Sequence, residues 1–178
     1  MDGTSVAGLT PPMIRDVTPA DHAAILDINN ATYPAMNLLD APALAGIIAE
    51  CTYARVAVDE QGVAAFLLGL PPGADYDSDN YRWFSARYDD FVYVDRIAVH
   101  PRAQNHGLGA ALYDDIAQWG TGRCPCILAE VNLIPPNPGS QRFHLRRGFT
   151  IVGELDHPFD GTYTKRTVML HRALRTLT

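Results

Sequence analysis

The sequence predicts an α/β domain built on a mixed, mostly antiparallel sheet with helices on both faces. Apolar segments typical of strands recur along the chain and are separated by segments with helical apolar spacing. The stretch 91–120 is the clearest case, because a strand there runs through a glycine-containing loop into an amphipathic helix. With 178 residues, 47% of them hydrophobic, the chain fits one domain with a substantial core. We therefore expect a loose tail over residues 1–13 and a single domain over residues 14–178.

Composition and charge argue against several classes of partner. The net charge is −6 and the pI is near 5.4, and no run of Lys and Arg interleaved with aromatic residues occurs. The longest apolar run, 63–68, is too short to span a bilayer, and the N-terminal residues lack the pattern of a signal peptide. We expect no nucleic-acid partner and no membrane partner.

The cysteines indicate a reducing compartment, most simply the cytoplasm. Cys51, Cys124 and Cys126 make an odd count without the spacing of a disulfide scaffold. Cys124 and Cys126 leave a metal or redox pair open, but two cysteines entering an apolar strand are more often small buried hydrophobes. We expect no metal site.

Two helices and three strands are predicted in the first part of the chain. A short strand over 14–17 precedes a capping box at 18–21, which has proline at its first helical position and opens a helix. Asp40 is the N-cap of a second helix, whose apolar residues repeat at i, i+3, i+4 and i+7. The strands 53–58 and 63–70 form a hairpin, and the second is apolar on both faces and therefore central.

The central stretch begins with a strand over 91–99. Simple alternation places Phe91, Tyr93, Asp95, Ile97 and Val99 on one face and Val92, Val94, Arg96 and Ala98 on the other. His100 and Pro101 end the strand, and a helix is predicted from Gly107 to Gly120. Two glycines opening a helix leave backbone N–H groups free beside the positive end of the helix dipole. Such a loop suits a phosphate or pyrophosphate.

Three ligand classes use this chemistry, and the glycines could also serve packing alone. A P-loop nucleotidase requires Gly-Lys-Ser/Thr, which is absent. A dinucleotide-binding fold requires a third glycine where Leu112 stands. Coenzyme A is the third class.

The order of strand, Val99-His100-Pro101, Gln104-x-x-Gly107-x-Gly109 and helix resembles the acyl-CoA-binding core of the GNAT superfamily of N-acetyltransferases. A second element agrees with the first. The run from Asn137 through Ser140 and His144 to Gly148-Phe149 resembles the superfamily's Asn-x-x-Ala-x-x-x-Tyr pattern followed by Gly-Phe. This run is also predicted to be a helix by its Asn N-cap and its C-terminal glycine. The resemblance covers roughly residues 14–170.

The resemblance implies the GNAT fold, with splayed central strands, and acetyl-CoA as cofactor. The strand over 126–131 is expected to separate from the strand over 91–99, so that the backbones of Ile97 and Val99 can bond to the pantetheine amides. Further strands are expected over 149–155 and 163–171. The cofactor-binding residues implied by the resemblance are Ile97, Ala98, Val99, Gln104, Asn105, His106, Gly107, Leu108, Gly109, Ala110, Asn137, Ser140 and His144.

Gln104 and Asn105 depart from the superfamily pattern, because Arg and Gly are most frequent at these positions. The loop therefore carries less positive charge. Asn tolerates the left-handed backbone that the position requires. The candidate partners for the ribose phosphate are Arg102, Arg142 and Arg146, although the last two could simply lie on a solvated helix face.

The reaction implied by the resemblance requires a base for the amine and an acid for the thiolate. Asp95 is the preferred base, followed by Glu130 and then Asp90, although Asp95 could instead pair with an arginine and Glu130 could cap a loop. His144 stands where the superfamily's Tyr protonates the departing thiolate, and it could act as the acid or be a hydrogen-bonded wall residue. The backbone N–H of Ile97 is expected to stabilise the oxyanion.

The predicted function is acetyl-CoA-dependent transfer of an acetyl group to a primary amine of a small molecule, by direct attack on the thioester. A covalent intermediate is not implied, because no Gly-x-Ser-x-Gly elbow is present. A non-catalytic acyl-CoA-binding module and an acetyltransferase for a protein amine are the alternatives. The aromatic residues Tyr81, Trp83 and Tyr88 could line the acceptor pocket or pack a short helix on the sheet. Monomer and homodimer both stay open.

Overall fold

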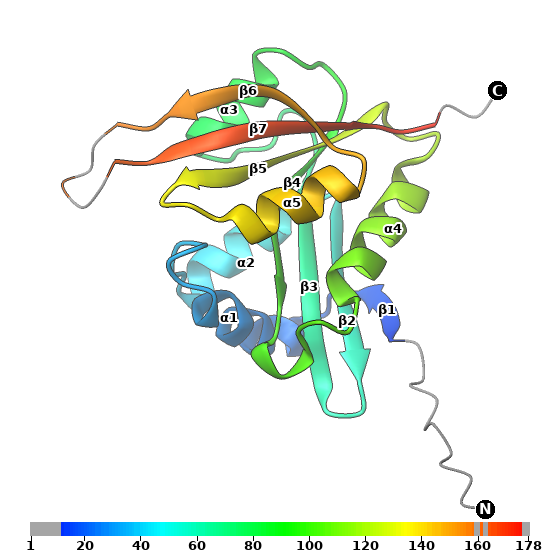
Figure 1. Ribbon diagram of the computed structural model, residues 1–178. Coiled ribbons are helices and arrows are strands. Elements are labelled where there is room, and N and C mark those ends of the chain that lie inside the picture. Colours follow the sequence, from blue (N-terminus) through cyan, green and yellow to red (C-terminus); the bar gives the residue numbers. More distant parts are fainter. Residues whose placement is uncertain (1–11, 159–160, 162–163, 176–178) are drawn as a thin grey trace, which may run out of the picture.

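The computed structural model describes residues 12–158, 161 and 164–175. These residues form one sheet in the order β1-β2-β3-β4-β5-β7-β6, in which only β4 and β5 are parallel (Figure 1). The strands are β1 (Met13–Asp16), β2 (Tyr53–Asp59), β3 (Gly62–Leu70), β4 (Val92–Val99), β5 (Cys126–Ile134), β6 (Thr150–Asp156) and β7 (Arg166–Ala173). The α-helices are α1 (His22–Ala31), α2 (Ala41–Glu50), α3 (Asp79–Ser85), α4 (Leu108–Gly120) and α5 (Pro138–Arg146), and short 3-10 turns lie at η1 (Pro19–Asp21) and η2 (Pro101–Ala103).

These elements confirm the predicted fold class, with differences at several element ends. The capping box is present but opens η1, and α1 follows it. The acidic, turn-rich composition of residues 75–80 predicts a loop, but residues 79 and 80 belong to α3, because Ser78 caps that helix. Most of the tail predicted over 1–13 lies outside the described residues, as does Tyr163 of the last predicted strand.

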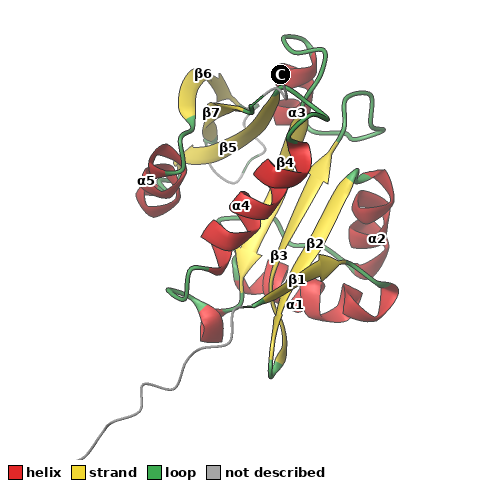
Figure 2. Cartoon of the chain, turned by 90° about the vertical axis from the view of Figure 1, so that its right-hand side faces the viewer, coloured by secondary structure: helices red, strands yellow, loops and turns green. Residues whose placement is uncertain are grey.

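Helices cover both faces of the sheet. Leu112 and Ile116 of α4 pack on the face formed by Leu67 of β3 and its neighbours. Ile25 of α1 and Leu44 of α2 pack on the opposite face. Figure 2 shows α4 on one side of β2 and β3, with α1 and α2 on the other. The helix α3 lies on the same face as α1 and α2. Its buried residues pack against Leu70 of β3, which lies on the same face of that strand as Leu68, and Leu68 packs against α1 and α2.

The sheet opens between β4 and β5, as expected. Their parallel ladder is limited to the pairs Val92–Ile127 and Tyr93–Leu128. Beyond these pairs β4 stays with β3 as far as Val99, whereas β5 stays with β7 as far as Ile134. Figure 1 shows β5, β7 and β6 turning away from β1–β4. The splay therefore leaves a gap that connects the two faces of the sheet.

The predicted alternation of β4 is wrong beyond Val94. The register with β3 shifts, because Leu68 pairs with Arg96 while Gly69 pairs with Val94, so that Asp95 is an extra residue in β4. Such a bulge reverses which residues share a face, and glycines within strands often mark one. Val92 and Val94 consequently lie on the α4 face together with Ile97 and Val99.

Candidate active site

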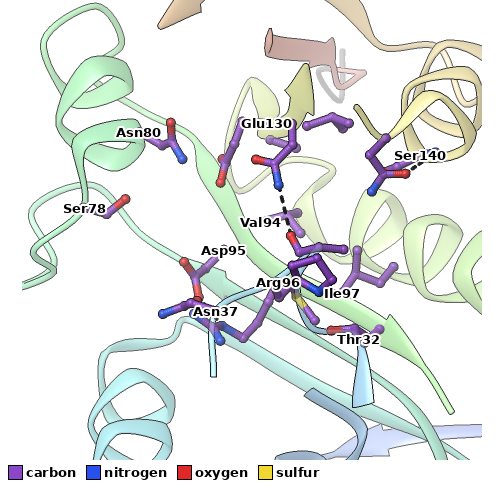
Figure 3. Close-up of a pocket in the computed structure, with 18 of the residues that line it drawn as sticks. Thr32, Asn37, Ser78, Asn80, Val94, Asp95, Arg96, Ile97, Glu130 and Ser140 are labelled. Carbon is purple, nitrogen blue, oxygen red and sulfur yellow. Dashed lines mark hydrogen bonds and ion pairs between the residues drawn. The ribbon is translucent and has the colours of Figure 1, made fainter. Parts of the chain in front are cut away.

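A cleft of about 690 Å³ occupies the gap between β4 and β5, a volume typical of small-molecule sites. On the α4 and α5 side it is lined by residues that include Tyr113, Ser140 and His144. On the other side it is lined by the α1–α2 loop, the β3–α3 loop and Glu130 of β5. Figure 3 shows Glu130, Asp95 and Asn80 converging on this cleft from β5, β4 and α3.

The backbone of β4 presents hydrogen-bonding groups to the gap. The N–H of His100 donates to the carbonyl of Ala64 at 2.8 Å, which fixes the phase of the antiparallel ladder with β3. Residues that bond to the neighbouring strand alternate with residues that do not. Ala98 therefore points its N–H and C=O at β3, whereas Ile97 and Val99 point theirs towards the gap. These are the two residues whose backbones were expected to meet the pantetheine arm.

The N-terminus of α4 has free N–H groups at the end of the glycine loop. Gly107 is the N-cap with φ of +78°, and Asn105 has φ of +65°, so both adopt the left-handed backbone expected for this turn. The first bond of the helix runs from the N–H of Ala111 to the carbonyl of Gly107 at 2.9 Å. In the described part of the chain, the N–H groups of the three residues before Ala111 have no acceptor. These free N–H groups at the positive end of the helix have the geometry that an anion requires, and the predicted pyrophosphate site stays a prediction.

The arginines near this loop differ in how they are engaged. Arg102 pairs with Asp59 and donates to the carbonyl of Val63, so it is already bound to the β2–β3 hairpin. Arg142 and Arg146 are exposed on α5, and their predicted role towards the ribose phosphate stays a prediction.

Glu130 lies where the gap begins. Leu128 is the last β5 residue paired with β4, and Glu130 follows it on the same face. The strand continues to Ile134, beyond its predicted end at 131, so Glu130 lies within the strand rather than capping a loop. Its buried Oε2 and the buried hydroxyl of Tyr93 make no hydrogen bond of ordinary geometry among the described residues, although Tyr93 and Asn80 lie close enough to Glu130 to offset part of its pKa shift. Burial, together with the charge of Asp95, raises the pKa of Glu130 to about 8.

Both carboxylate oxygens of Asp95 accept hydrogen bonds from neighbouring side chains. Its carboxylate accepts the hydroxyl proton of Tyr76 at 2.5 Å and the Nε–H of Arg96 at 2.6 Å, and its side chain is only 5% exposed. The alternative that Asp95 pairs with an arginine is therefore confirmed. Asp90, the third candidate base, is exposed and does not line the cleft. Glu130 is thus the candidate whose carboxylate has an unpartnered oxygen at the gap.

His144 is buried on α5 and bonded through both ring nitrogens. Nδ1 lies 2.8 Å from the carbonyl oxygen of Ser140, and because a carbonyl only accepts, the proton sits on Nδ1. Burial lowers the pKa of His144, so the ring is neutral at neutral pH. Nε2 then accepts the hydroxyl proton of Tyr113, 2.7 Å away on α4.

Sequence reasoning missed Tyr113. The residue lies on the buried side of α4 and is fully buried, next to His144 and Phe149. The available signal was its hydroxyl, because a tyrosine on the apolar side of a helix needs a polar partner. That partner is His144 only because α5 packs against α4, and this packing cannot be predicted from a local sequence pattern.

The aromatic residues Tyr81, Trp83 and Tyr88 pack α3 and its C-terminal end on the rest of the domain, and the packing alternative is confirmed. Tyr81 is buried and donates to the carbonyl of Pro71 at 2.6 Å. Trp83 lies under Arg87, with 3.9 Å from the guanidinium carbon to the ring centroid. Tyr88 stacks on His171. The described tyrosines that line the cleft are Tyr33, Tyr76 and Tyr113.

The described residues offer neither a cluster of metal ligands nor a membrane-spanning helix. They contain no group of three or more His, Cys, Asp or Glu side chains suited to a metal ion, and the three cysteines are free. Within the same residues, every helix is too short or too polar to cross a membrane.

Comparison with known proteins places these features in a family. The sequence profile described as "Acetyltransferase (GNAT) family" matches residues 23–149. No curated protein sequence matches the chain. Among solved structures, the ribosomal-protein-S18-alanine N-acetyltransferase from Escherichia coli has a TM-score of 0.72 and 15% identity over 94% of this chain and 96% of its own. Ard1 from Thermoplasma volcanium has a TM-score of 0.74 and 17% identity over 93% of this chain and 99% of its own.

A phosphinothricin acetyltransferase from Sinorhizobium meliloti, crystallised with acetyl-CoA, has a TM-score of 0.69 and 21% identity over 93% of this chain and 89% of its own. At such identities these structures show the fold alone, which is the GNAT fold. The profile match extends over most of the sheet, from α1 through the glycine loop to the start of β6. On this match, the chain belongs to the GNAT acetyltransferase family.

Proposed function

We propose that the protein transfers the acetyl group of acetyl-CoA to a primary amine of a small molecule, by direct attack of the amine on the thioester. The observation that carries the proposal is the gap between β4 and β5. It joins a half-cleft beside the free N-terminus of α4 to a half-cleft that contains the unpartnered carboxylate oxygen of Glu130. Membership of the family supports an acyl-CoA donor, and Arabidopsis thaliana NAA60, with the same fold, was crystallised with acetyl-CoA.

In this proposal the donor binds on the α4 and α5 side. The N–H groups of Leu108, Gly109 and Ala110 hold the pyrophosphate, and the free backbone groups of Ile97 and Val99 bond to the pantetheine amides. Gln104 of the loop and Asn137 and Ser140 of α5 line the same cleft, which agrees with their expected contacts to the cofactor. The N–H of Ile97 then lies near the thioester carbonyl and stabilises the oxyanion. The backbone of Ala98 faces β3 and its side chain packs on the α1 and α2 face, which does not support its predicted contact with the cofactor. The predicted contacts of Asn105 and His106 stay predictions.

A charge in the first turn of α4 tests the pyrophosphate site. Ala110→Glu is expected to weaken acetyl-CoA binding about tenfold relative to Ala110→Gln, because only the carboxylate repels the pyrophosphate. An acid near a helix N-terminus stabilises the helix, so the fold should survive. Calorimetric Kd values at low and high salt measure the effect, which should shrink as salt screens the charges. Equal Kd values for the two variants would contradict the site.

Glu130 is the proposed base. It takes a proton from the acceptor ammonium, and the freed nitrogen lone pair attacks the thioester carbonyl carbon to form the C–N bond. The tetrahedral intermediate loses its second nitrogen proton to water and collapses with cleavage of the C–S bond, and coenzyme A leaves as a thiolate. Because the pKa of Glu130 is raised to about 8, the carboxylate is a stronger base than an exposed glutamate would be.

Tyr113 and His144 are proposed to protonate the thiolate together. In the neutral ring the one proton of His144 is held by the carbonyl of Ser140, so the transferable proton is the one on the Tyr113 hydroxyl. Burial raises the pKa of Tyr113, so its hydroxyl is protonated in the resting enzyme, and the phenolate left by the transfer regains a proton from water before the next turnover. His144 then acts by orienting the hydroxyl.

Two assays test the function. Acetyl-CoA at about 100 times its Kd should raise the Tm by roughly 5–10 °C for a chain of this size. A panel of primary amines should then release free thiol from acetyl-CoA in proportion to N-acetylated product. A Tm shift without thiol release for any small or peptide amine would make the protein a non-catalytic acyl-CoA-binding module. The absence of a shift at millimolar acetyl-CoA would contradict the donor.

A further inference from the structure

We propose that the acceptor is a primary amine with an apolar body and no negative charge beside its nitrogen, and that an apolar wall selects it. The wall consists of the apolar residues of the α1–α2 loop, namely Tyr33, Pro34, Ala35, Met36 and Leu38. This inference rests on the proposed function and specifies the substrate class of the same cleft.

The wall combines exposure with a place in the cleft. All five residues line the cleft, yet Tyr33 is 56% exposed and Leu38 is 58% exposed. Large apolar side chains gain free energy when a ligand removes them from water, and they are the usual lining of a small-molecule site. In this cleft they lie on the Glu130 side of the gap, away from the N-terminus of α4.

The loop that carries the wall is fixed by side-chain hydrogen bonds to its backbone. Asn30 bonds to both the N–H and the carbonyl of Leu39 at 3.0 Å each. Asn29 donates to the carbonyl of Asn37 at 3.1 Å, and Asn132 of β5 donates to the carbonyl of Ala35 at 3.2 Å. The exposed apolar side chains are therefore presented on a preorganised backbone, which lowers the entropy lost on binding.

The bulge residue Asp95 connects this loop to the opposite rim of the cleft. Tyr76 of the β3–α3 loop donates to Asp95, and Asp95 accepts from Arg96. Arg96 in turn donates to Asn29 at 2.8 Å, the same side chain that holds the α1–α2 loop. Figure 3 shows Asp95 and Arg96 between Asn37 and Glu130. We therefore assign Asp95 as a positioning residue that sets the distance between the two rims.

The charges of the cleft favour a cation without an adjacent anion. Asp77 and Asp79 line it, but both pair with Arg82. The charge of Arg96 is already matched by Asp95. Among the described residues, Glu130 is therefore the lining carboxylate without an ion pair, and it is negatively charged above its raised pKa. An acceptor with a carboxylate beside its amine would face Glu130 at the gap and would depend on Lys165, another lining cation. The test therefore includes such an acceptor.

Three matched acceptors test the proposal in the full-length protein with acetyl-CoA. The values of kcat/KM for 2-phenylethylamine should exceed those for ethanolamine, which lacks the apolar body, by about 10- to 50-fold. They should exceed those for phenylalanine, which adds a carboxylate, by at least about tenfold. A preference for phenylalanine that disappears in Lys165→Ala would overturn the proposal in favour of an anionic acceptor.

Variants of the wall locate the effect. Tyr33→Ala and Leu38→Ala should raise KM for 2-phenylethylamine about 5- to 20-fold, with a smaller effect on KM for ethanolamine and no change in the Kd for acetyl-CoA. Ile151→Ala removes an equally exposed apolar side chain on β6, outside the cleft, and should change nothing. Asp95→Asn should raise KM for the amine more than it lowers kcat, which distinguishes a positioning residue from a base. Wall variants with an unchanged KM would overturn the inference while leaving the proposed function intact, whereas thiol release from no amine would overturn both.

Discussion

Glu130→Gln is expected to lower kcat for amine acetylation by about 10²- to 10³-fold, with the Kd for acetyl-CoA within twofold of wild type. The amide keeps the shape of the side chain but cannot accept the ammonium proton, and general bases contribute effects of this order. Initial rates of thiol release at saturating acetyl-CoA measure the loss. Glu154→Gln on β6, whose carboxylate is exposed and outside the cleft, is the matched control and should be fully active.

Thermal stability separates this loss from unfolding. The folded-state pKa of Glu130 is raised from 4.5 to about 8, so the folded protein binds the proton more tightly than the unfolded chain does. That contribution to stability is complete below about pH 4.5 and is lost as the pH rises to 8. The side chain of Glu130→Gln does not titrate. The Tm of the variant relative to that of the wild type should therefore increase as the pH rises from 4.5 to 8, and the variant should have the higher Tm at pH 8. A fully active Glu130→Gln would return the role of base to Asp95 or to water.

Tyr113→Phe is expected to lower kcat by about 10- to 100-fold without changing the Kd for acetyl-CoA. The substitution removes the hydroxyl that shares a proton with His144, while the ring keeps its contacts with Phe143, His144 and Phe149. Transfer of a proton to the thiolate then becomes slower, and the solvent isotope effect on kcat should change. Rapid-quench measurement of product formation identifies the step affected.

Two further variants complete this test. Tyr88→Phe removes a hydroxyl outside the cleft and should leave kcat unchanged. His144→Ala should lose activity in the same range as Tyr113→Phe if the two act as one unit, and the double variant should add little. A Tyr113→Phe enzyme with wild-type kcat beside an inactive His144→Ala enzyme would assign the proton to His144 itself.

The parts of the fold that local interactions determine could be predicted from the sequence. The strand, glycine loop and helix at 91–120 follow from apolar spacing, from the left-handed backbone of Asn105 and Gly107 and from the free N–H groups of the first helical turn. The helix α5 follows from its caps, since Asn137 accepts the N–H of Ser140 and Gly148 adopts φ of +84°. These features depend only on neighbours a few residues away.

The parts that depend on distant partners could not be predicted. The bulge at Asp95 exists because β4 pairs with β3 in a shifted register, and alternation within β4 alone carries no trace of it. Arg96 donates a hydrogen bond to Asn29, which is 67 residues away in the sequence, and Tyr113 bonds to His144, which is 31 residues away. The preference between Asp95 and Glu130 depended on another such contact, because Tyr76 donates to the carboxylate of Asp95 across 19 residues while an oxygen of Glu130 stays without a partner among the described residues.

The pH dependence of kcat/KM, compared between wild type and Glu130→Gln, tests the central claim most directly. For wild type we expect kcat/KM to rise about tenfold per pH unit below an inflection near 8, and to level off above it until the acceptor amine itself titrates. For Glu130→Gln we expect low values without that inflection. The same inflection in both enzymes, at comparable rates, would contradict the assignment of Glu130 as the base in the gap between β4 and β5.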